Sequence, residues 1–342
     1  MIKEFSVRRG KVKSTKKIIF IPQTNELRLS MFNKQELLAR VKFLLPYSVR
    51  CKISKILSKR RAKKANSIES RLAELRDIII FNHPIHLVPQ ATGKLRLLQE
   101  GNAALLHHFA AKCEEYGLQY WMDYGTLLGA VRHKGVIPWD DDLDVGMMSE
   151  DYNTLSALLP TLFREEDGFR YSRHAFIQIG VKGTPLNIDI FPYYRYSSAD
   201  SEESRAILLS RLANVRKRVV YYHGKLNMPV EQCEDIICHE VLKGEKALNL
   251  EENPLIFLSP VAMMIRDRIF SADDIFPLKK VSFESSSYSA PHHSRRYLEI
   301  LYGDYMSYPP KVGFWHQHLE AIVKNTPFES DVNAFIDKYG LS

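Results

Sequence analysis

The sequence predicts an α+β protein in which a mixed β-sheet is flanked by helices. Short apolar runs with the alternation typical of strands are interspersed with longer segments whose apolar residues recur at helical spacing. Two of the strand-like runs are joined by Lys182–Pro185, a short connection rich in turn-forming residues. The chain has 342 residues, 45% hydrophobic and 26% charged, which suffices for one large domain or two of ordinary size. Four cysteines without a CxxC pair indicate neither a disulfide scaffold nor a zinc site.

The elements follow from these patterns in chain order. A helix is predicted to begin at Asn66 and to end before Pro84, and a linker follows it. A long helix is predicted from Leu95 to Tyr116, with Gly117 at its C-terminal end. Further helices are predicted over residues 127–133 and 202–222 and directly after a capping Ser149. Strands are predicted over residues 119–123, 143–147, 169–181, 186–194 and 278–283, and the rest of the C-terminal part is expected to be mostly helical.

The positive charge of the chain lies at its N-terminus. Residues 1–65 contain 19 Lys and Arg against 3 acidic residues, whereas residues 66–342 contain 29 against 37. Apolar residues between positions 37 and 57 recur at helical spacing among basic ones, which predicts a basic amphipathic arm bent at Pro46. Three interpretations are open: peripheral contact with an anionic membrane, packing on the body or on a partner chain, and nucleic-acid binding. Sparse aromatic residues disfavour the last, so no nucleic-acid partner is expected.

Membrane-spanning and exported proteins are not expected from this sequence. The apolar runs Ile18–Ile21 and Ile78–Phe81 are far shorter than the roughly 20 residues that a transmembrane helix needs. The basic N-terminal stretch has no small-residue cleavage site after it, so a signal peptide is not predicted. We therefore expect a cytoplasmic protein, peripheral at the inner face of the cytoplasmic membrane if the arm binds lipid.

Two acidic residues at the start of a predicted strand indicate a cation site. Asp142 and Asp144 are two positions apart and therefore lie on one face of the strand. Like charges about 4 Å apart repel by about 4 kcal/mol at an effective dielectric constant near 20, so the pair calls for a cation or a shared proton. Carboxylate ligands suit a hard ion such as Mg²⁺ or Mn²⁺. A solvated turn or a calcium loop is the alternative.

A third acid, Asp189, lies in the second predicted strand, within Asn187–Phe191. It points to the polar side between two apolar neighbours, Ile188 and Ile190. If the two strands are adjacent, Asp189 completes a three-carboxylate cluster that can hold a metal and receive a hydroxyl proton.

Candidate phosphate-binding groups precede these acids. Gly125-Thr126 is predicted to form a turn where a strand ends and a helix begins, so free N–H groups and a hydroxyl there could bind phosphate. Arg132 and Lys134 follow and could neutralise diphosphate charge. A plain tight turn and two ordinary solvated cations are the alternatives.

The segments Asp123–Gly135 and Ile137–Val145 closely resemble the signature of the LicD family, which includes bacterial phosphocholine transferases and is related to the fukutin group. The family resembles the nucleotidyltransferase superfamily, whose sites combine a Gly-Ser or Gly-Thr turn, a DxD strand and a distant Asp. Residues 274–280 and 301–306 also look like C-terminal blocks of the family. The resemblance covers about residues 95–310 and implies a nucleotidyltransferase-like mixed sheet.

The resemblance implies an enzyme, a metal-dependent phosphotransferase. It would move a phospho-alcohol such as phosphocholine from a CDP-alcohol donor to a hydroxyl of a cell-surface glycan (lipopolysaccharide, capsule or teichoic acid) or of a lipid-linked saccharide, releasing CMP. The cofactor would be Mg²⁺ or Mn²⁺. The metal-binding and catalytic residues would be Asp142, Asp144 and Asp189. The donor phosphates would be held by Gly125, Thr126, Arg132 and Lys134.

Two other functions stay open. A nucleotidyltransferase acting on a small molecule or sugar needs the same acids, and a non-catalytic glycan- or membrane-associated protein would use them as a structural calcium site. With the resemblance, the chain divides into four predicted parts. They are the basic arm (1–65), a helix and linker (66–94), the catalytic domain (95–310) and a C-terminal helical extension (311–342).

Overall fold

The computed structural model describes residues 84–226, 254–259, 268–308 and 328–340, with further residues at 68, 70–72, 74, 75, 236, 241 and 242. The chain divides into two compact units, residues 1–75 and 76–342, and the fold described below is that of the second. The basic arm predicted for residues 1–65 lies outside the described residues. The residues described between positions 68 and 75 are helical, in the segment where a helix is predicted.

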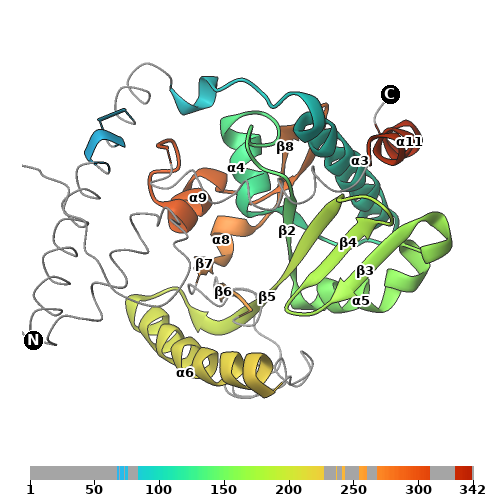
Figure 1. Cartoon of the computed structure of the whole chain (residues 1–342). Coiled ribbons are helices and arrows are strands. Elements are labelled where there is room, and N and C mark those ends of the chain that lie inside the picture. Colours follow the sequence, from blue (N-terminus) through green and yellow to red (C-terminus); the bar gives the residue numbers. More distant parts are fainter. Residues whose placement is uncertain are drawn as a thin grey trace, which may run out of the picture. The chain divides into compact units, whose positions relative to one another are not determined.

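The second unit contains both helices and strands (Figure 1). The α-helices among its described residues are α3 (Gly93–Glu115), α4 (Tyr124–Arg132), α5 (Ser149–Leu162), α6 (Glu202–Leu226), α8 (Ala272–Ile275), α9 (Ser294–Tyr302) and α11 (Glu329–Tyr339). Its strands are β1 (Trp121–Met122), β2 (Leu143–Met148), β3 (Phe169–Arg173), β4 (Ile177–Val181), β5 (Asn187–Ala199), β6 (Pro254–Leu258), β7 (Ile269–Ser271), β8 (Lys279–Phe283) and β9 (Ser286–Ala290).

The large sheet is mixed, as the sequence predicts. Its strands run in the order β1-β2-β5-β4-β3, and β6 and β7 extend it from the C-terminal half of β5. The central pair β2–β5 is parallel, whereas the other pairs of this sheet are antiparallel. Since parallel strands need covered faces, β2 is apolar and buried along most of its length. The hairpin β8–β9 forms a separate sheet of two strands.

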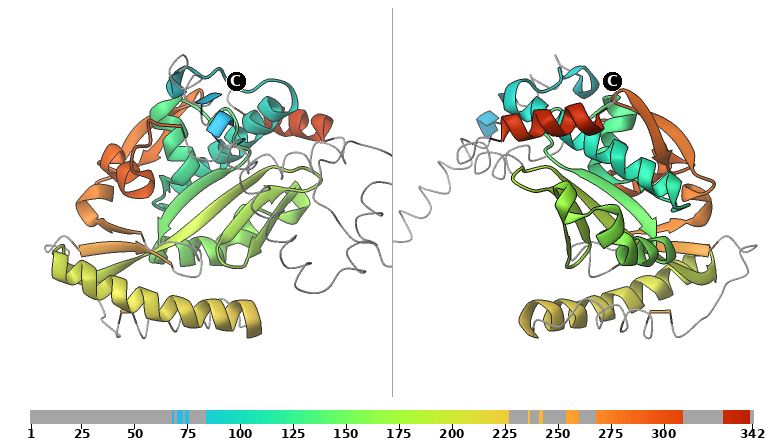
Figure 2. Two further views of the ribbon diagram at one scale, coloured as in Figure 1. Left: turned by 60° about the vertical axis from the view of Figure 1, so that its left-hand side comes forward. Right: turned by 90° about the vertical axis from the view of Figure 1, so that its right-hand side faces the viewer.

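The main core lies between the central strands and the helices packed on them. The long helix α3 contributes Leu98, Leu105 and Phe109, which recur at helical spacing and are almost completely buried. The C-terminal helix α11 lies beside α3 in both views of Figure 2, and its Val332 and Phe335 belong to the same core. The helix predicted in the C-terminal extension is thus an integral part of this core. None of the described helices is long and apolar enough to span a bilayer.

The structure corrects several predicted elements. Residues 169–181 form two strands, β3 and β4, because the chain reverses at residues 174–176, which contain neither Gly nor Pro. Ser149 is the first residue of α5, and Met148 occupies the N-cap position without a capping side chain. The C-terminal part contains β6, β7 and β9 in addition to the predicted strand. Short apolar runs such as Pro254–Leu258 carry no periodicity that separates strand from helix.

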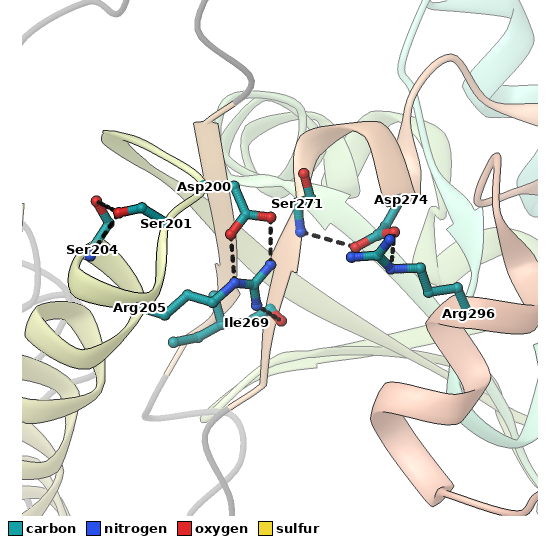
Figure 3. A network of polar contacts seen from close by, with 8 residues as sticks. All are labelled: Asp200, Ser201, Ser204, Arg205, Ile269, Ser271, Asp274 and Arg296. Carbon is teal, nitrogen blue, oxygen red and sulfur yellow. Dashed lines mark hydrogen bonds and ion pairs between the residues drawn. The ribbon is translucent and has the colours of Figure 1, made fainter.

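An ion pair fixes α6 to the end of the large sheet (Figure 3). The Arg205 guanidinium donates from Nε to Asp200 Oδ1 at 2.5 Å, from Nη2 to Asp200 Oδ2 at 2.7 Å and from Nη1 to the Ile269 carbonyl at 3.2 Å. The side-chain hydrogen bonds from Arg205 lower the pKa of Asp200 below its ordinary value. Nearby, Arg296 pairs with the buried Asp274 at 2.9 Å. These contacts connect α6 to β7 and α9 to α8.

We expect Asp200→Asn to lower the free energy of unfolding by about 1–3 kcal/mol at pH 7, because a two-point, charge-assisted contact is lost. The pKa of Asp200 is depressed, so its contribution is complete above the ordinary carboxylate pKa near 3.9 and is lost as the pH falls through the lower folded value. Urea unfolding at pH 7 and pH 3 measures both effects. Glu202→Gln, which removes a charge from the same exposed helix end, is the control. Equal losses of unfolding free energy in the two variants at pH 7 would contradict a stabilising role for the Asp200–Arg205 ion pair.

Candidate active site

The parallel pair β2–β5 brings the three predicted acids together. Asp144 of β2 and Asp189 of β5 are register partners, and Asp142 comes directly before β2. One carboxylate oxygen from each of these three residues lies within 4.8 Å of the other two. The adjacency on which the sequence prediction depended is therefore present in the fold.

Asp140 is a further member of this cluster that the sequence prediction missed. Oxygens of Asp140, Asp141 and Asp142 also lie within 4.8 Å of one another. The Asp140 carboxylate packs against Gly125 so closely that a Cβ on this glycine would lie 2.6 Å from Asp140 Oδ2. Strand alternation could not identify Asp140, because β2 begins only at Leu143 and the preceding backbone is irregular. The run of three acids before the strand was the available signal.

The electrostatics of the cluster are unfavourable without a counter-charge. Burial raises the pKa of Asp144 well above its ordinary value, and the negative charges of Asp142, Asp189 and Asp140 raise it further. Burial and the charge of Asp142 likewise raise the pKa of Asp140, while Arg132 opposes this shift. A cation or bound protons would stabilise these carboxylates.

Asp189 is oriented by two amide side chains. It is 8% exposed, and its Oδ1 accepts hydrogen bonds from Gln178 Nε2 at 2.9 Å and from Asn187 Nδ2 at 2.6 Å. Burial raises the pKa of Asp189, and these two hydrogen bonds act in the opposite direction. Asn187 and Asp189 belong to β5 and Gln178 to the neighbouring β4, so the sheet itself fixes this carboxylate.

The N-terminal turn of α4 is bonded to the acidic strand. Gly125 and Thr126 lie inside this first helical turn, not in the turn predicted before a helix. The Gly125 N–H donates to Asp144 Oδ2 at 3.2 Å, and the Asp144 N–H donates to Thr126 Oγ1 at 2.6 Å. Thr126 is 1% exposed. Both residues therefore contact Asp144 in this structure, and their binding of donor phosphates stays a prediction.

The two predicted phosphate cations have different environments. Arg132 is buried, and it donates to the Tyr305 carbonyl at 2.7 Å and to His133 Nε2 at 2.9 Å. Its guanidinium lies 5.9 Å from the ring centre of Trp139, and burial lowers the pKa of Arg132 to about 10. Lys134 is exposed. Of the two, Lys134 is the side chain that solvent reaches.

A fully buried hydrogen-bond network around Asp123 holds the N-terminus of α4. The Asp123 carboxylate caps the helix by accepting from the Tyr124 N–H at 2.8 Å. It also accepts from the Tyr193 hydroxyl at 2.5 Å and from the Tyr297 hydroxyl at 2.8 Å. Burial raises the pKa of Asp123 to about 6, against the effect of these hydrogen bonds. The network joins α4, β5 and α9, and sequence reasoning did not identify Asp123 or its partners as functional residues.

The region that carries these features matches a known family. Residues 117–221 match the family model described as "LicD/FKTN/FKRP, nucleotidyltransferase domain". The match includes the predicted glycine–threonine pair and all three predicted acids. The resemblance to the LicD family is thus confirmed for this part of the chain. The two C-terminal blocks at residues 274–280 and 301–306 lie outside the matched range.

Individual relatives show the same relationship over short segments. The chain is 54% identical over 48 residues to the lipopolysaccharide cholinephosphotransferase LicD of Haemophilus influenzae, covering 14% of this chain and 18% of that protein. It is 60% identical over 73 residues to an uncharacterized protein of Rickettsia prowazekii, covering 21% and 26%. It is 33% identical over 88 residues to the human ribitol 5-phosphate transferase FKRP, covering 24% and 18%. These alignments span about a quarter or less of each relative.

We expect the acidic cluster to destabilise the metal-free chain increasingly as the pH rises from about 4 to 7.5. The pKa values of Asp144, Asp140 and Asp189 are raised in the folded state, so these three carboxylates bind more protons in the folded chain than in the unfolded chain in this interval. Asp144→Asn removes one repelling charge at nearly constant shape. In the presence of a chelator it should raise the melting temperature by a few degrees at pH 7.5, about 2–4 °C for each kcal/mol, and change it little at pH 4.

Differential scanning calorimetry measures these melting temperatures, with Glu114→Gln on the exposed side of α3 as the control. The control removes a carboxylate outside the cluster and should give the wild-type pH dependence. If Asp144→Asn lowers the melting temperature equally at both pH values, repulsion within the cluster is not what limits the stability of the metal-free chain.

Proposed function

We propose that this chain is a metal-dependent phosphotransferase of the LicD type. It moves a phospho-alcohol such as phosphocholine from a CDP-alcohol donor to a hydroxyl of a cell-surface glycan, and CMP is released. The observation that carries the proposal is the in-register pairing of Asp144 with Asp189, which gathers three carboxylates inside the segment that matches the LicD family. Two relatives are named as a cholinephosphotransferase and a ribitol 5-phosphate transferase, which supports this reaction class.

The donor set fits a hard divalent cation. Asp142, Asp144 and Asp189 offer only carboxylate oxygens, gathered within 4.8 Å, and burial together with the neighbouring negative charges raises the pKa of Asp144. These three residues would hold Mg²⁺ or Mn²⁺, with Asp140 beside them. When bound, the metal would offset the charge that develops on the donor phosphates.

Side chains of the protein would carry out the proton transfer and contact the leaving group. Asp189, which Gln178 and Asn187 hold in one orientation, would accept the proton of the attacking hydroxyl. The new bond joins the hydroxyl oxygen to the phosphorus of the phospho-alcohol, and the bond from this phosphorus to the oxygen of CMP breaks. The exposed Lys134 would contact the leaving phosphate. Membrane contact through residues 1–65 would bring lipid-linked acceptors close and stays a prediction.

A second candidate is a nucleotidyltransferase, because the matched family model is described by that domain name. It would use the same acids but transfer a nucleoside monophosphate, so that pyrophosphate would leave from a nucleoside triphosphate. The product therefore distinguishes the two reactions.

We expect Gly125→Ala to weaken divalent-ion binding without unfolding the chain. The new Cβ would lie 2.6 Å from Asp140 Oδ2 and displace this carboxylate, whereas alanine itself favours the helix. In Gly129→Ala, the other glycine variant of α4, the Cβ would lie 2.4 Å from the main-chain oxygen of Gly135 and should destabilise the fold instead. Calorimetric titration with Mn²⁺ and thermal unfolding separate the two effects. Unchanged Mn²⁺ affinity in a folded Gly125→Ala variant would contradict a role for the Asp140 side of the cluster.

The reaction itself is tested by CMP release. The purified chain with Mg²⁺ should release CMP from at least one of CDP-choline, CDP-ethanolamine, CDP-ribitol and CDP-glycerol when bacterial lipopolysaccharide or teichoic acid is the acceptor. Asp144→Ala should lower the rate by about 100-fold or more, because metal-ion catalysis is worth several kcal/mol. Glu114→Gln should retain the wild-type rate. Pyrophosphate release from nucleoside triphosphates, with no CMP from any of the four donors, would favour the second candidate.

A further inference from the structure

Two buried amide side chains of α3 contact the main chain that carries the acids. Gln99 and Asn102 are each 1% exposed. Gln99 Nε2 donates to the main-chain oxygens of Ile137 at 3.1 Å and Asp140 at 2.9 Å. Asn102 Nδ2 donates to the main-chain oxygen of Asp141 at 2.8 Å. Helix α3 lies outside the segment that matches the LicD family, so the match gives these residues no role.

Asn102 differs from Gln99 because its amide also reaches the second acidic strand. Its Oδ1 accepts from the main-chain N–H of Asn187 at 2.9 Å. One side chain therefore bridges the residue directly before Asp142 and the residue two positions before Asp189. The side chain of Asn187 in turn donates to Asp189 Oδ1 at 2.6 Å.

Asn102 forms this bridge directly before the residues at which β2 and β5 begin to pair. The β2–β5 register begins with Leu143 and Ile188, so Asp142 precedes the paired residues. Repulsion between Asp142 and Asp189 acts to separate the acidic segment from β5 at this point. A primary amide has both a donor and an acceptor, and Asn102 uses one for each segment. A leucine of similar size would fill the space and bond neither segment.

We propose that Asn102 is a positioning residue that sets the separation of Asp142 from Asp189 and thereby the affinity of the cluster for a divalent cation. The inference rests on the proposed function, since it takes the cluster to be the metal site. It assigns Asn102 no contact with substrate or metal. Its effect is transmitted through the main chain on both sides of the cluster.

The test is isothermal titration calorimetry of Mn²⁺ into the full chain, well below the melting temperature of each variant. Asn102→Leu should weaken Mn²⁺ binding by about 10–100-fold, the range seen when residues that orient metal ligands are removed. The control is Leu105→Ala, which destabilises the same helix through a fully buried side chain with no bond to the acidic segments. It should bind Mn²⁺ as the wild type does. If Asn102→Leu does not fold, Asn102→Ser, whose shorter hydroxyl cannot bridge both segments, takes its place.

The outcomes separate the two proposals. Wild-type affinity in Asn102→Leu or Asn102→Ser would overturn the positioning role and leave the metal site intact. Equal weakening by Leu105→Ala would overturn it as well, because loss of stability alone would then account for the effect. Absence of Mn²⁺ binding by the wild-type chain would overturn the proposed metal site and this inference with it.

Discussion

Mutual repulsion between closely spaced carboxylates is the constraint around which this part of the molecule is organised. The parallel ladder between β2 and β5 holds Asp144 beside Asp189, and the chain before β2 adds Asp140 and Asp142. Burial raises the pKa of Asp144 and Asp140, and their neighbours' charges raise it further. Such a cluster is expected to lower the stability of the folded chain at neutral pH, which is the usual cost of a functional site such as the cation site that we propose.

The surrounding fold opposes this repulsion with hydrogen-bond donors, in addition to the positive charge of Arg132 near Asp140. The positive end of α4 directs the Gly125 N–H at Asp144, and the amides of Gln178 and Asn187 bond Asp189. On the other side, Asn102 of α3 joins the two acidic segments. Donors of this kind orient the carboxylates without neutralising them, so the cluster retains the negative charge that the proposed divalent cation would require.

The sequence predicts those site residues that a local pattern, such as strand alternation, identifies. Alternation along one strand places Asp142 and Asp144 on one face, and Asp189 joins them if the two predicted strands are neighbours. Asp140 was missed because alternation does not apply before β2 begins at Leu143. Asn102 carries no local signal, since a polar residue in a long helix is expected at the surface, and its partners lie 39 and 85 residues away along the chain. The strands β6 and β7 were missed because their short apolar runs fit either a strand or a buried helix.

The most direct measurement of the central claim is a crystal structure of the chain with Mn²⁺, with the ion located from its anomalous scattering. The account predicts an anomalous peak within coordination distance of carboxylate oxygens from Asp142, Asp144 and Asp189 together. Density for the three side chains with no peak between them at saturating Mn²⁺, or a peak at other residues only, would contradict it.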